Sequence, residues 1–217
     1  MTHSFPKIIW QTHNYKKEWL PEHLHSIAGT WINLNPGWEY RYVDQVQREE
    51  TIKKYPEVYE IYKYLMPIPQ ADLWRYIITY EHGGCYADMD SACTKPLDFV
   101  LDEIGGDPEM VVVPEHDGSG NNANFIVKAN SPLMKQIVDT MLPKPFIQDF
   151  FNPWGTFVST AYEYPNVSKL YNGVSHSLDY KRDFHVDKFI IEQNGKKMLY
   201  KDFLDQNQLR SNPLRHD

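Results

Sequence analysis

Cysteine is scarce in this sequence, whose 217 residues contain only Cys85 and Cys93. Two thiols so close together in the chain cannot form the framework of a disulfide-stapled fold. Hydrophobic residues make up 41% and charged residues 24%, which is ordinary for a globular protein with its own core. Because no repeat, low-complexity tract or linker interrupts the chain, we expect a reduced protein with one domain over residues 1–217.

Basic clusters and long apolar runs are also missing. The net charge is −7, and no stretch gathers Lys and Arg in the way that nucleic-acid-binding surfaces do. No apolar run reaches the about 18 residues that a membrane helix needs, and no basic segment followed by an apolar one opens the chain. The sequence therefore predicts a cytoplasmic protein with no membrane segment and no nucleic-acid partner. An anionic ligand would need a local site or a metal ion.

Short apolar strands alternate with helical patterns along the first two thirds of the chain. Strands are expected at residues 6–11, 38–43, 85–88, 110–114 and 123–128, and helices at residues 20–34, 45–66 (mixed), 70–82 and 131–142. The last third has no clear pattern. This alternation predicts an α/β sandwich around a mostly parallel sheet, in which ligands bind beyond the carboxyl ends of the strands.

The triplet Asp88-Met89-Asp90 follows one of these strands, where that rule places a site. In an extended segment Asp88 and Asp90 would share a face and Met89 would turn into the protein. Two carboxylates on one face repel each other unless a cation joins them, and Mg²⁺ or Mn²⁺ binds a few carboxylates together with phosphate oxygens. Because such triplets are also common in solvated loops, the interpretation depends on the surrounding residues.

The helix before this triplet carries a second polar group. Asp72, Arg75, Tyr76 and Thr79 fall on one face at about 100° per residue, and apolar residues cover the opposite side, which is expected to face the core. Asp72 and Arg75 could form a surface ion pair contributing about 0.3 kcal/mol. Alternatively, a rigid carboxylate and guanidinium could hold a sugar and its phosphate.

Four blocks of sequence carry a resemblance to a known family. They are PKIIWQ at residues 6–11, NPGWEY at residues 35–40, ADLWRY at residues 71–76 and GGCYADMD at residues 83–90. In this order they resemble the DXD-containing sugar transferases of glycosyltransferase family 32, which are similar to the catalytic core of the large clostridial glucosylating toxins. The resemblance implies a GT-A fold, a nucleoside-diphosphate sugar donor, Mn²⁺ or Mg²⁺, and retention of anomeric configuration.

The resemblance also implies roles for individual residues. Asp90 would bind the metal, with Asp88 contacting donor hydroxyls and sharing the metal, while Asp72 and Arg75 would hold the donor sugar. These four form the implied catalytic set. Further contacts with the donor would come from Ile9, Trp10, Gln11 and Thr12 along the nucleoside, from Tyr76 and Met89, and from Asn122 or Asn124 toward the acceptor.

Family members often add a C-terminal histidine to the metal site, and His185 is expected here, with His176 as its rival. A neutral imidazole suits Mn²⁺. The sequence departs from the family where Gly155-Thr156 replaces a frequent Gly-Pro, and no tryptophan follows Trp154.

The expected reaction moves a hexose from a nucleoside-diphosphate sugar to a hydroxyl acceptor such as a glycan, or to water. UDP-glucose or UDP-galactose is favoured as donor by the resemblance to the toxins. No carboxylate is assignable to the sugar face opposite the leaving group, so we expect the donor phosphate to accept the acceptor's proton. A catalytically silent sugar-nucleotide-binding protein and a metal-dependent phosphoesterase remain alternatives, whereas the Gly/Lys-rich loop of a nucleotidyltransferase is not visible.

Overall fold

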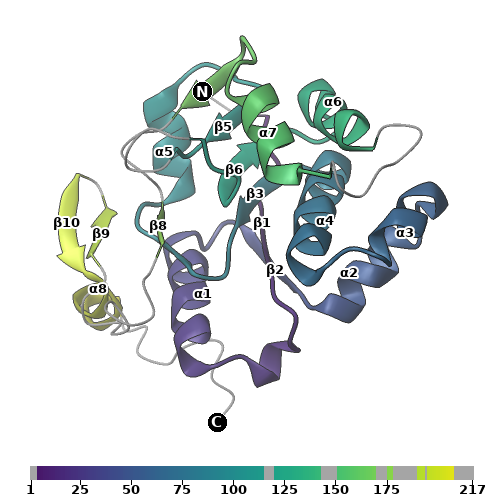
Figure 1. Cartoon of the computed structure of the whole chain (residues 1–217). Coiled ribbons are helices and arrows are strands. Elements are labelled where there is room, and N and C mark those ends of the chain that lie inside the picture. Colours follow the sequence, from purple (N-terminus) through teal and green to yellow (C-terminus); the bar gives the residue numbers. More distant parts are fainter. Residues whose placement is uncertain are drawn as a thin grey trace.

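The protein is a layered α/β sandwich in which helices cover both faces of one central sheet (Figure 1). The computed structural model describes residues 4–114, 120–142, 151–169, 175–177 (backbone only), 190–193 and 195–207. In Figure 1, α1 and α5 lie on one side of the sheet, and α4, α6 and α7 lie on the other. This arrangement confirms the fold class predicted from the alternation of strands and helices.

The central sheet has six strands in the order β2-β1-β3-β6-β5-β7. They are β1 (Ile8–Thr12), β2 (Glu39–Val43), β3 (Gly84–Ala87), β5 (Met110–Val112), β6 (Asn124–Val127) and β7 (Val167–Lys169). Strand β1 is parallel to β2 and β3, and β5 is parallel to β7, whereas β6 is antiparallel to both of its neighbours. The start of β6 therefore meets the carboxyl end of β3, with Asn124 opposite Ala87.

The main helices are α1 (Glu22–Leu34), α2 (Gln45–Ile52), α3 (Pro56–Tyr62), α4 (Pro67–His82), α5 (Leu97–Ile104), α6 (Pro132–Met141) and α7 (Pro153–Ala161). Helices were predicted where α1, α2, α3, α4 and α6 lie, whereas α5 and α7 were not predicted. Helix α4 begins three residues before the predicted Gln70, because proline is tolerated in the first turn of a helix. Among the helices that the structure describes, none is both long and apolar enough to cross a bilayer.

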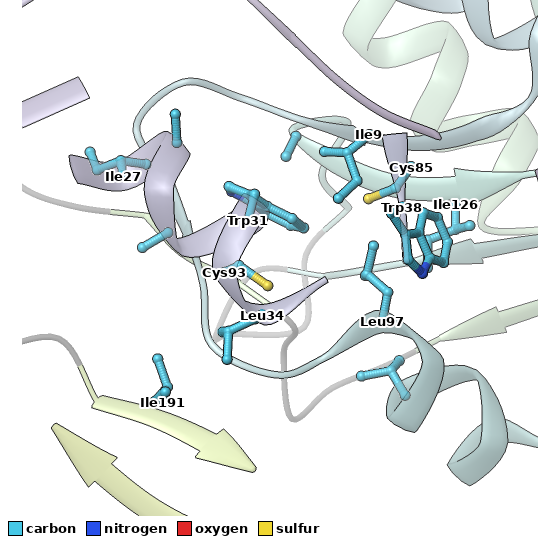
Figure 2. Packing of buried hydrophobic residues seen from close by; sticks show 14 of the residues in the cluster. Ile9, Ile27, Trp31, Leu34, Trp38, Cys85, Cys93, Leu97, Ile126 and Ile191 are labelled. Atoms are coloured by element: carbon cyan, nitrogen blue, oxygen red, sulfur yellow. The ribbon is translucent and has the colours of Figure 1, made fainter. Parts of the chain in front are cut away.

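Side chains of the central strands alternate between two hydrophobic clusters, one on each face of the sheet. Ile9 and Cys85 face the cluster beneath α1 and α5, whereas Trp10 and Tyr86 face the cluster beneath α4, α6 and α7. Figure 2 shows the first cluster, where residues of α1 pack toward the sheet beside Cys93 and Leu97. Because helices cover both faces, a ligand can reach the sheet at the ends of its strands or along its edge strands.

Shorter elements complete the described part of the chain. They are a 3₁₀ turn (Lys17–Trp19), β4 (Ser91–Cys93), β8 (Ser175–Ser177), β9 (Ile190–Gln193), β10 (Lys196–Leu199) and α8 (Tyr200–Gln206). Strand β4 pairs with β8, and β9 pairs with β10. Helix α1 holds β4 in place, because the Trp31 indole donates to the Ser91 carbonyl at 2.6 Å and the Thr30 hydroxyl accepts from the Cys93 amide at 2.8 Å. A strand of three residues is too short to show a period in the sequence.

Two glycines turn the chain from α4 into β3. Gly83 and Gly84 have φ values of +66° and +100°, a region that side chains with a Cβ rarely occupy. A Cβ on Gly84 would lie 2.5 Å from the Ile8 carbonyl oxygen on the neighbouring strand β1. The pair therefore ends the helix and also lets β3 approach β1 closely, which places the following residues at the edge of the sheet.

We expect Gly84→Ala to lower the free energy of unfolding by at least about 2 kcal/mol, through backbone strain and the clash with Ile8. Gly37→Ala is the matched control, because a Cβ there meets nothing within 4 Å and should change stability by no more than about 0.5 kcal/mol. Urea unfolding followed by circular dichroism measures both. Equal stabilities for the two variants would contradict this account of the Gly83-Gly84 turn.

Candidate functional site

Polar side chains gather at the carboxyl end of β3, between the first half of α4 and the start of β6. Asp88, Met89 and Asp90 form a turn there, closed by the Ser91 amide donating to the Asp88 carbonyl at 3.0 Å. The prediction of an extended segment is therefore wrong: β4 follows β3 at once, and the chain must bend between them. The prediction that Met89 points into the protein is confirmed, since it is 5% exposed and belongs to the hydrophobic cluster beneath α1.

Arg75 lies at the centre of this site. Its Nη2 is 3.1 Å from Asp72 Oδ1 and 3.2 Å from Asp88 Oδ1, and its Nη1 donates to the Asn122 carbonyl at 2.9 Å. The guanidinium also stacks over the Tyr86 ring, 4.4 Å from its centroid. One side chain thus joins helix α4, the turn after β3 and the segment before β6.

The structure rules out the surface ion pair considered for α4. The side chains of Arg75 and Asp72 are only 6% and 10% exposed. The prediction that the apolar side of α4 faces the core is confirmed, but every residue from Asp72 to Thr79 is buried, so the polar side is covered as well. The apolar residues pack against neighbouring helices and the sheet, while the polar residues face the carboxyl ends of the strands. Because water is largely excluded there, these polar residues depend on hydrogen bonds and ion pairs within the protein.

Asp88 is held in one orientation by several groups. The Tyr86 hydroxyl donates to Asp88 Oδ1 at 2.7 Å, so this oxygen is shared between Tyr86 and Arg75. The Gln11 side chain donates to the Asp88 carbonyl at 3.0 Å, and the Tyr40 hydroxyl in turn donates to Gln11 at 2.9 Å. Because the side-chain contacts of Asp88 with described residues use Oδ1, the second carboxylate oxygen is the one we expect to contact a ligand.

Negative charge is in excess at the site. Among the described residues, Asp72, Asp88 and Asp90 face one guanidinium, that of Arg75, which leaves two uncompensated charges when all three carboxyls are ionised. Burial raises the pKa of Asp72, and Arg75 offsets part of this rise. Burial and then the charge of Asp88 raise the pKa of Asp90. A cation placed between Asp88 and Asp90 would relieve this repulsion.

The residues present fit a divalent cation that is shared with a substrate. Among the described residues, no group of three or more His, Cys, Asp or Glu side chains could hold a metal alone. Asp88 and Asp90 supply a few hard oxygen ligands, and Mg²⁺ or Mn²⁺ bound in this way takes its remaining ligands from phosphate oxygens and water. Whether Mn²⁺ or Mg²⁺ is used stays a prediction.

Of the two predicted histidine ligands, His185 lies outside the described residues. His176 lies in β8, and its backbone pairs with Ala92 in β4, two positions after Asp90. Pairing of β4 with β8 therefore brings the backbone of His176 close to the turn that contains Asp90. The two residues are far apart in the sequence, so the sequence does not indicate that they are close. A metal–histidine contact stays a prediction for both residues.

The four residues of β1 that were predicted to line a nucleoside occupy different environments. Ile9 and Trp10 are 0% and 3% exposed and face the two hydrophobic clusters, with the Trp10 indole donating to the Gly83 carbonyl at 2.9 Å. Gln11 reaches the Asp88 carbonyl, and the Thr12 hydroxyl donates to the Val43 carbonyl at 2.6 Å. The nucleoside contact stays a prediction, and Gln11 and Thr12 lie closest to the carboxyl end of the strand.

Both predicted asparagines lie within the site. Asn122 donates to Asp72 Oδ1 at 3.2 Å and to the Tyr76 hydroxyl at 2.6 Å. Asn124 donates to the Ser91 hydroxyl at 3.2 Å, and its buried Oδ1 has no hydrogen-bond partner among the described residues. The structure therefore brings together Asp72, Arg75, Tyr76, Asp88, Asp90, Asn122 and Asn124.

Sequence reasoning missed Tyr86, although a signal for it was present. Residues i and i+2 of a strand share a face, so Tyr86 lies on the same side as Asp88 and bonds to it. It missed the contact with Tyr40 as well, which depends on the pairing of β2 with β1. No local pattern in the sequence points to that pairing.

Comparison with known proteins shows that this chain is similar in sequence to glycosyltransferases. Residues 21–111 match the family described as "Glycosyltransferase sugar-binding region containing DXD motif". The chain is 39% identical over 100 residues to mannosyl phosphorylinositol ceramide synthase SUR1 of Saccharomyces cerevisiae, covering 44% of this chain and 25% of that protein. It is 34% identical over 139 residues to inositol phosphoceramide mannosyltransferase 3 of Schizosaccharomyces pombe, covering 62% and 36%.

The chain thus spans only about a quarter to a third of the length of these relatives. Among solved structures, the PaToxG glycosyltransferase superposes with a TM-score of 0.55 at 13% identity, covering 74% of this chain and 69% of that one. At that identity the likeness shows the fold alone. The predicted GT-A architecture and the predicted resemblance to the DXD family are both confirmed.

We expect Asp90→Asn to raise the melting temperature of the metal-free protein at pH 7. Burial and Asp88 raise the pKa of Asp90 above 3.8, so the folded state holds this proton more tightly than the unfolded chain does. The stability that Asp90 contributes is therefore present at low pH and is lost as the pH rises through its folded pKa. The advantage of the asparagine should shrink as the pH falls toward 3.8, which thermal unfolding in EDTA can measure.

The matched control is Asp139→Asn on the surface of α6. Asp139 pairs with Lys135 and its side chain is 62% exposed, so its loss should change stability by less than about 1 kcal/mol. A lower melting temperature for Asp90→Asn than for the wild type at pH 7 would show that Asp90 stabilises the fold, against this reading of the site.

Proposed function

From the glycosyltransferase sugar-binding region that residues 21–111 carry, we propose that the chain transfers a hexose from a nucleoside-diphosphate sugar to a hydroxyl acceptor. The observation that carries the proposal is the buried network in which Arg75 joins Asp72 and Asp88 at the carboxyl end of β3. Burying a guanidinium between two carboxylates has a desolvation cost that can exceed their attraction, so the network is explained better by the positioning of these acids than by stability. It keeps both acids fixed beside Asp90, as binding of a charged donor requires.

Each residue of the network has a role in this proposal. Asp72 accepts hydrogen bonds from donor hydroxyls, and the buried Arg75 orients its carboxylate and offsets part of the rise that burial causes in its pKa. Asp90 and the free oxygen of Asp88 hold a divalent cation, which when bound neutralises the departing diphosphate. Asn122 fixes Asp72 through its 3.2 Å hydrogen bond, so the sugar meets acceptors whose positions are set before it binds.

Mannose is the hexose that we propose first. Both relatives named above are mannosyl-transferring enzymes by name, and at 39% and 34% identity their sequences are more similar to this chain than that of the PaToxG glycosyltransferase is, at 13%. GDP-mannose therefore stands ahead of the UDP-glucose and UDP-galactose expected from the resemblance to toxins. The proposed acceptor is a hydroxyl on a glycan or on a lipid head group.

Retention of anomeric configuration is part of the proposal. Asp72 and Asp88 are engaged by Arg75 and Asp90 is assigned to the cation, so no carboxylate of the network is left to form a covalent bond to the sugar. The acceptor would then attack from the face of the leaving group, and the donor phosphate would accept its proton.

A donor panel tests the proposed function. Purified protein is incubated with GDP-mannose, UDP-glucose, UDP-galactose or UDP-N-acetylglucosamine, with and without Mn²⁺, and the release of nucleoside diphosphate is measured. We expect release from one donor, dependent on the metal and abolished by Asp90→Ala. Binding of a donor without release would identify a silent binding protein. Metal-dependent release of inorganic phosphate from a phosphomonoester would identify a phosphoesterase.

We expect Arg75→Lys to lower kcat/KM for the donor by at least about tenfold, equivalent to about 1.4 kcal/mol. Lysine keeps the charge but loses the planar fork that contacts Asp72, Asp88 and the Asn122 carbonyl. Steady-state kinetics measures the change, and Arg41→Lys is the control because Arg41, which pairs with Glu39 and stacks over Trp10, makes none of these three contacts. If the two variants retain the same kcat/KM, Arg75 does not organise the donor site.

A further inference from the structure

A second buried guanidinium lies at the carboxyl ends of β1 and β2, outside the network of Arg75. Arg48 of α2 is 1% exposed. Its Nη1 donates to the Thr12 hydroxyl at 2.6 Å and to the His13 carbonyl at 3.1 Å, and its Nη2 donates to Asn14 Oδ1 at 2.6 Å. One side chain therefore fixes the three successive residues by which the chain leaves β1.

Among the described residues, no carboxylate balances the charge of Arg48. None of the ion pairs within 4.0 Å in the described part of the chain involves it, and its described partners are uncharged oxygens. Burial lowers the pKa of His13 and the charge of Arg48 lowers it further, which favours a neutral His13. Burying a cation among neutral acceptors is costly, and an apolar side chain could tie α2 to the sheet at less cost.

The position of this cluster relates it to the network around Asp88. Thr12 pairs with Val43 at the carboxyl ends of β1 and β2, and the preceding residue, Gln11, bonds to the Asp88 carbonyl. Strand β1 is the neighbour of β3 in the sheet order β2-β1-β3. The residues around Arg48, at the end of β1, therefore lie one strand away from the turn after β3 that would hold the diphosphate. A donor extending from Asp88 along this edge would place its nucleoside over residues 12–14.

We propose that Arg48 is the positioning residue for the nucleoside half of the donor site. It holds residues 12–14 in the conformation that receives the base and ribose, while Asp88 and Asp90 receive the metal and the diphosphate. The inference rests on the proposed function and deepens it by dividing the site into two parts with separate supports. Affinity for a nucleoside diphosphate should therefore depend on Arg48, and affinity for a diphosphate without a nucleoside should not.

Isothermal titration of the full chain tests this division with GDP, UDP and inorganic pyrophosphate, each in the presence of Mn²⁺. In Arg48→Lys we expect the affinity for the nucleotide that the wild type binds to fall at least about tenfold, since lysine cannot make the three contacts of the fork. Pyrophosphate should bind within about twofold of the wild type. With sugar donor, KM should rise while kcat changes little, because the contact is made equally in the ground and transition states.

Lys53→Gln is the matched control, a cation at the end of the same helix that pairs with Glu49 and Glu50 at the surface. It should leave all three affinities unchanged. Should Arg48→Lys fail to fold, Asn14→Ala removes one contact of the guanidinium from an exposed residue and should weaken nucleotide binding about threefold, with pyrophosphate unaffected.

Two results would overturn the inference while leaving the proposed function in place. The first is unchanged nucleotide affinity in folded Arg48→Lys or Asn14→Ala. The second is a parallel loss of nucleotide and pyrophosphate affinity, which would mean that Arg48 supports the fold in general. If the wild-type chain binds neither nucleotide, the proposed function itself fails, and this inference fails with it.

Discussion

The buried guanidinium of Arg75 is the group on which the rest of the site depends. It makes charged contacts with Asp72 and Asp88, donates to the Asn122 carbonyl and stacks on Tyr86. These partners come from helix α4, strand β3 and the segment before β6, so one side chain connects three parts of the chain. Burial alone would lower the pKa of Arg75, but the charge of Asp88 foremost raises it, and the guanidinium stays protonated. Breaking one buried partnership of this kind typically costs about 3–5 kcal/mol.

The scaffold places this network through backbone geometry. Positive φ at Gly83 and Gly84 lets β3 lie against β1, and the antiparallel pairing of β6 brings residues 122–124 back to the carboxyl end of β3. On the opposite face, Trp31 and Thr30 of α1 hold β4, so the turn containing Asp88 and Asp90 is anchored on both sides. Two hydrophobic clusters hold the sheet rigid beneath it.

Stability and the proposed function oppose each other at this turn. Asp90 is partly buried beside Asp88, and its raised pKa shows that its ionised form is unfavourable in the metal-free fold. A residue selected for stability alone would not be charged there. A cation bound between Asp88 and Asp90 would balance the excess of negative charge and could also bind the diphosphate of a donor. The charge distribution therefore supports the proposed sugar-nucleotide site. The same reasoning applies with opposite sign at Arg48, a buried cation for which the described part of the chain supplies no carboxylate partner.

Local pattern was enough to identify the strand before Asp88 and the polar face of α4 with Asp72 and Arg75. Each of these depends on the period of a helix or strand, which a few neighbouring residues determine. The same reasoning failed for the extended form of the triplet, because the turn into β4 depends on the pairing of β4 with β8 and with α1. It also failed for the burial of Arg75, because the polar face of α4 is covered by β3 and β6 rather than by water.

What the sequence by itself determined is therefore the type of fold and the kind of chemistry: alternating elements, a pair of acids after a strand, and a carboxylate and guanidinium on the helix before it. Only the tertiary structure decided which groups meet. Asn122 reaches Asp72 and Tyr76, and Arg48 reaches residues 12–14, across separations of tens of residues. The physical reason is that periodicity is a property of neighbouring residues, whereas contacts between distant segments follow from strand order and register, which depend on the packing of the whole chain.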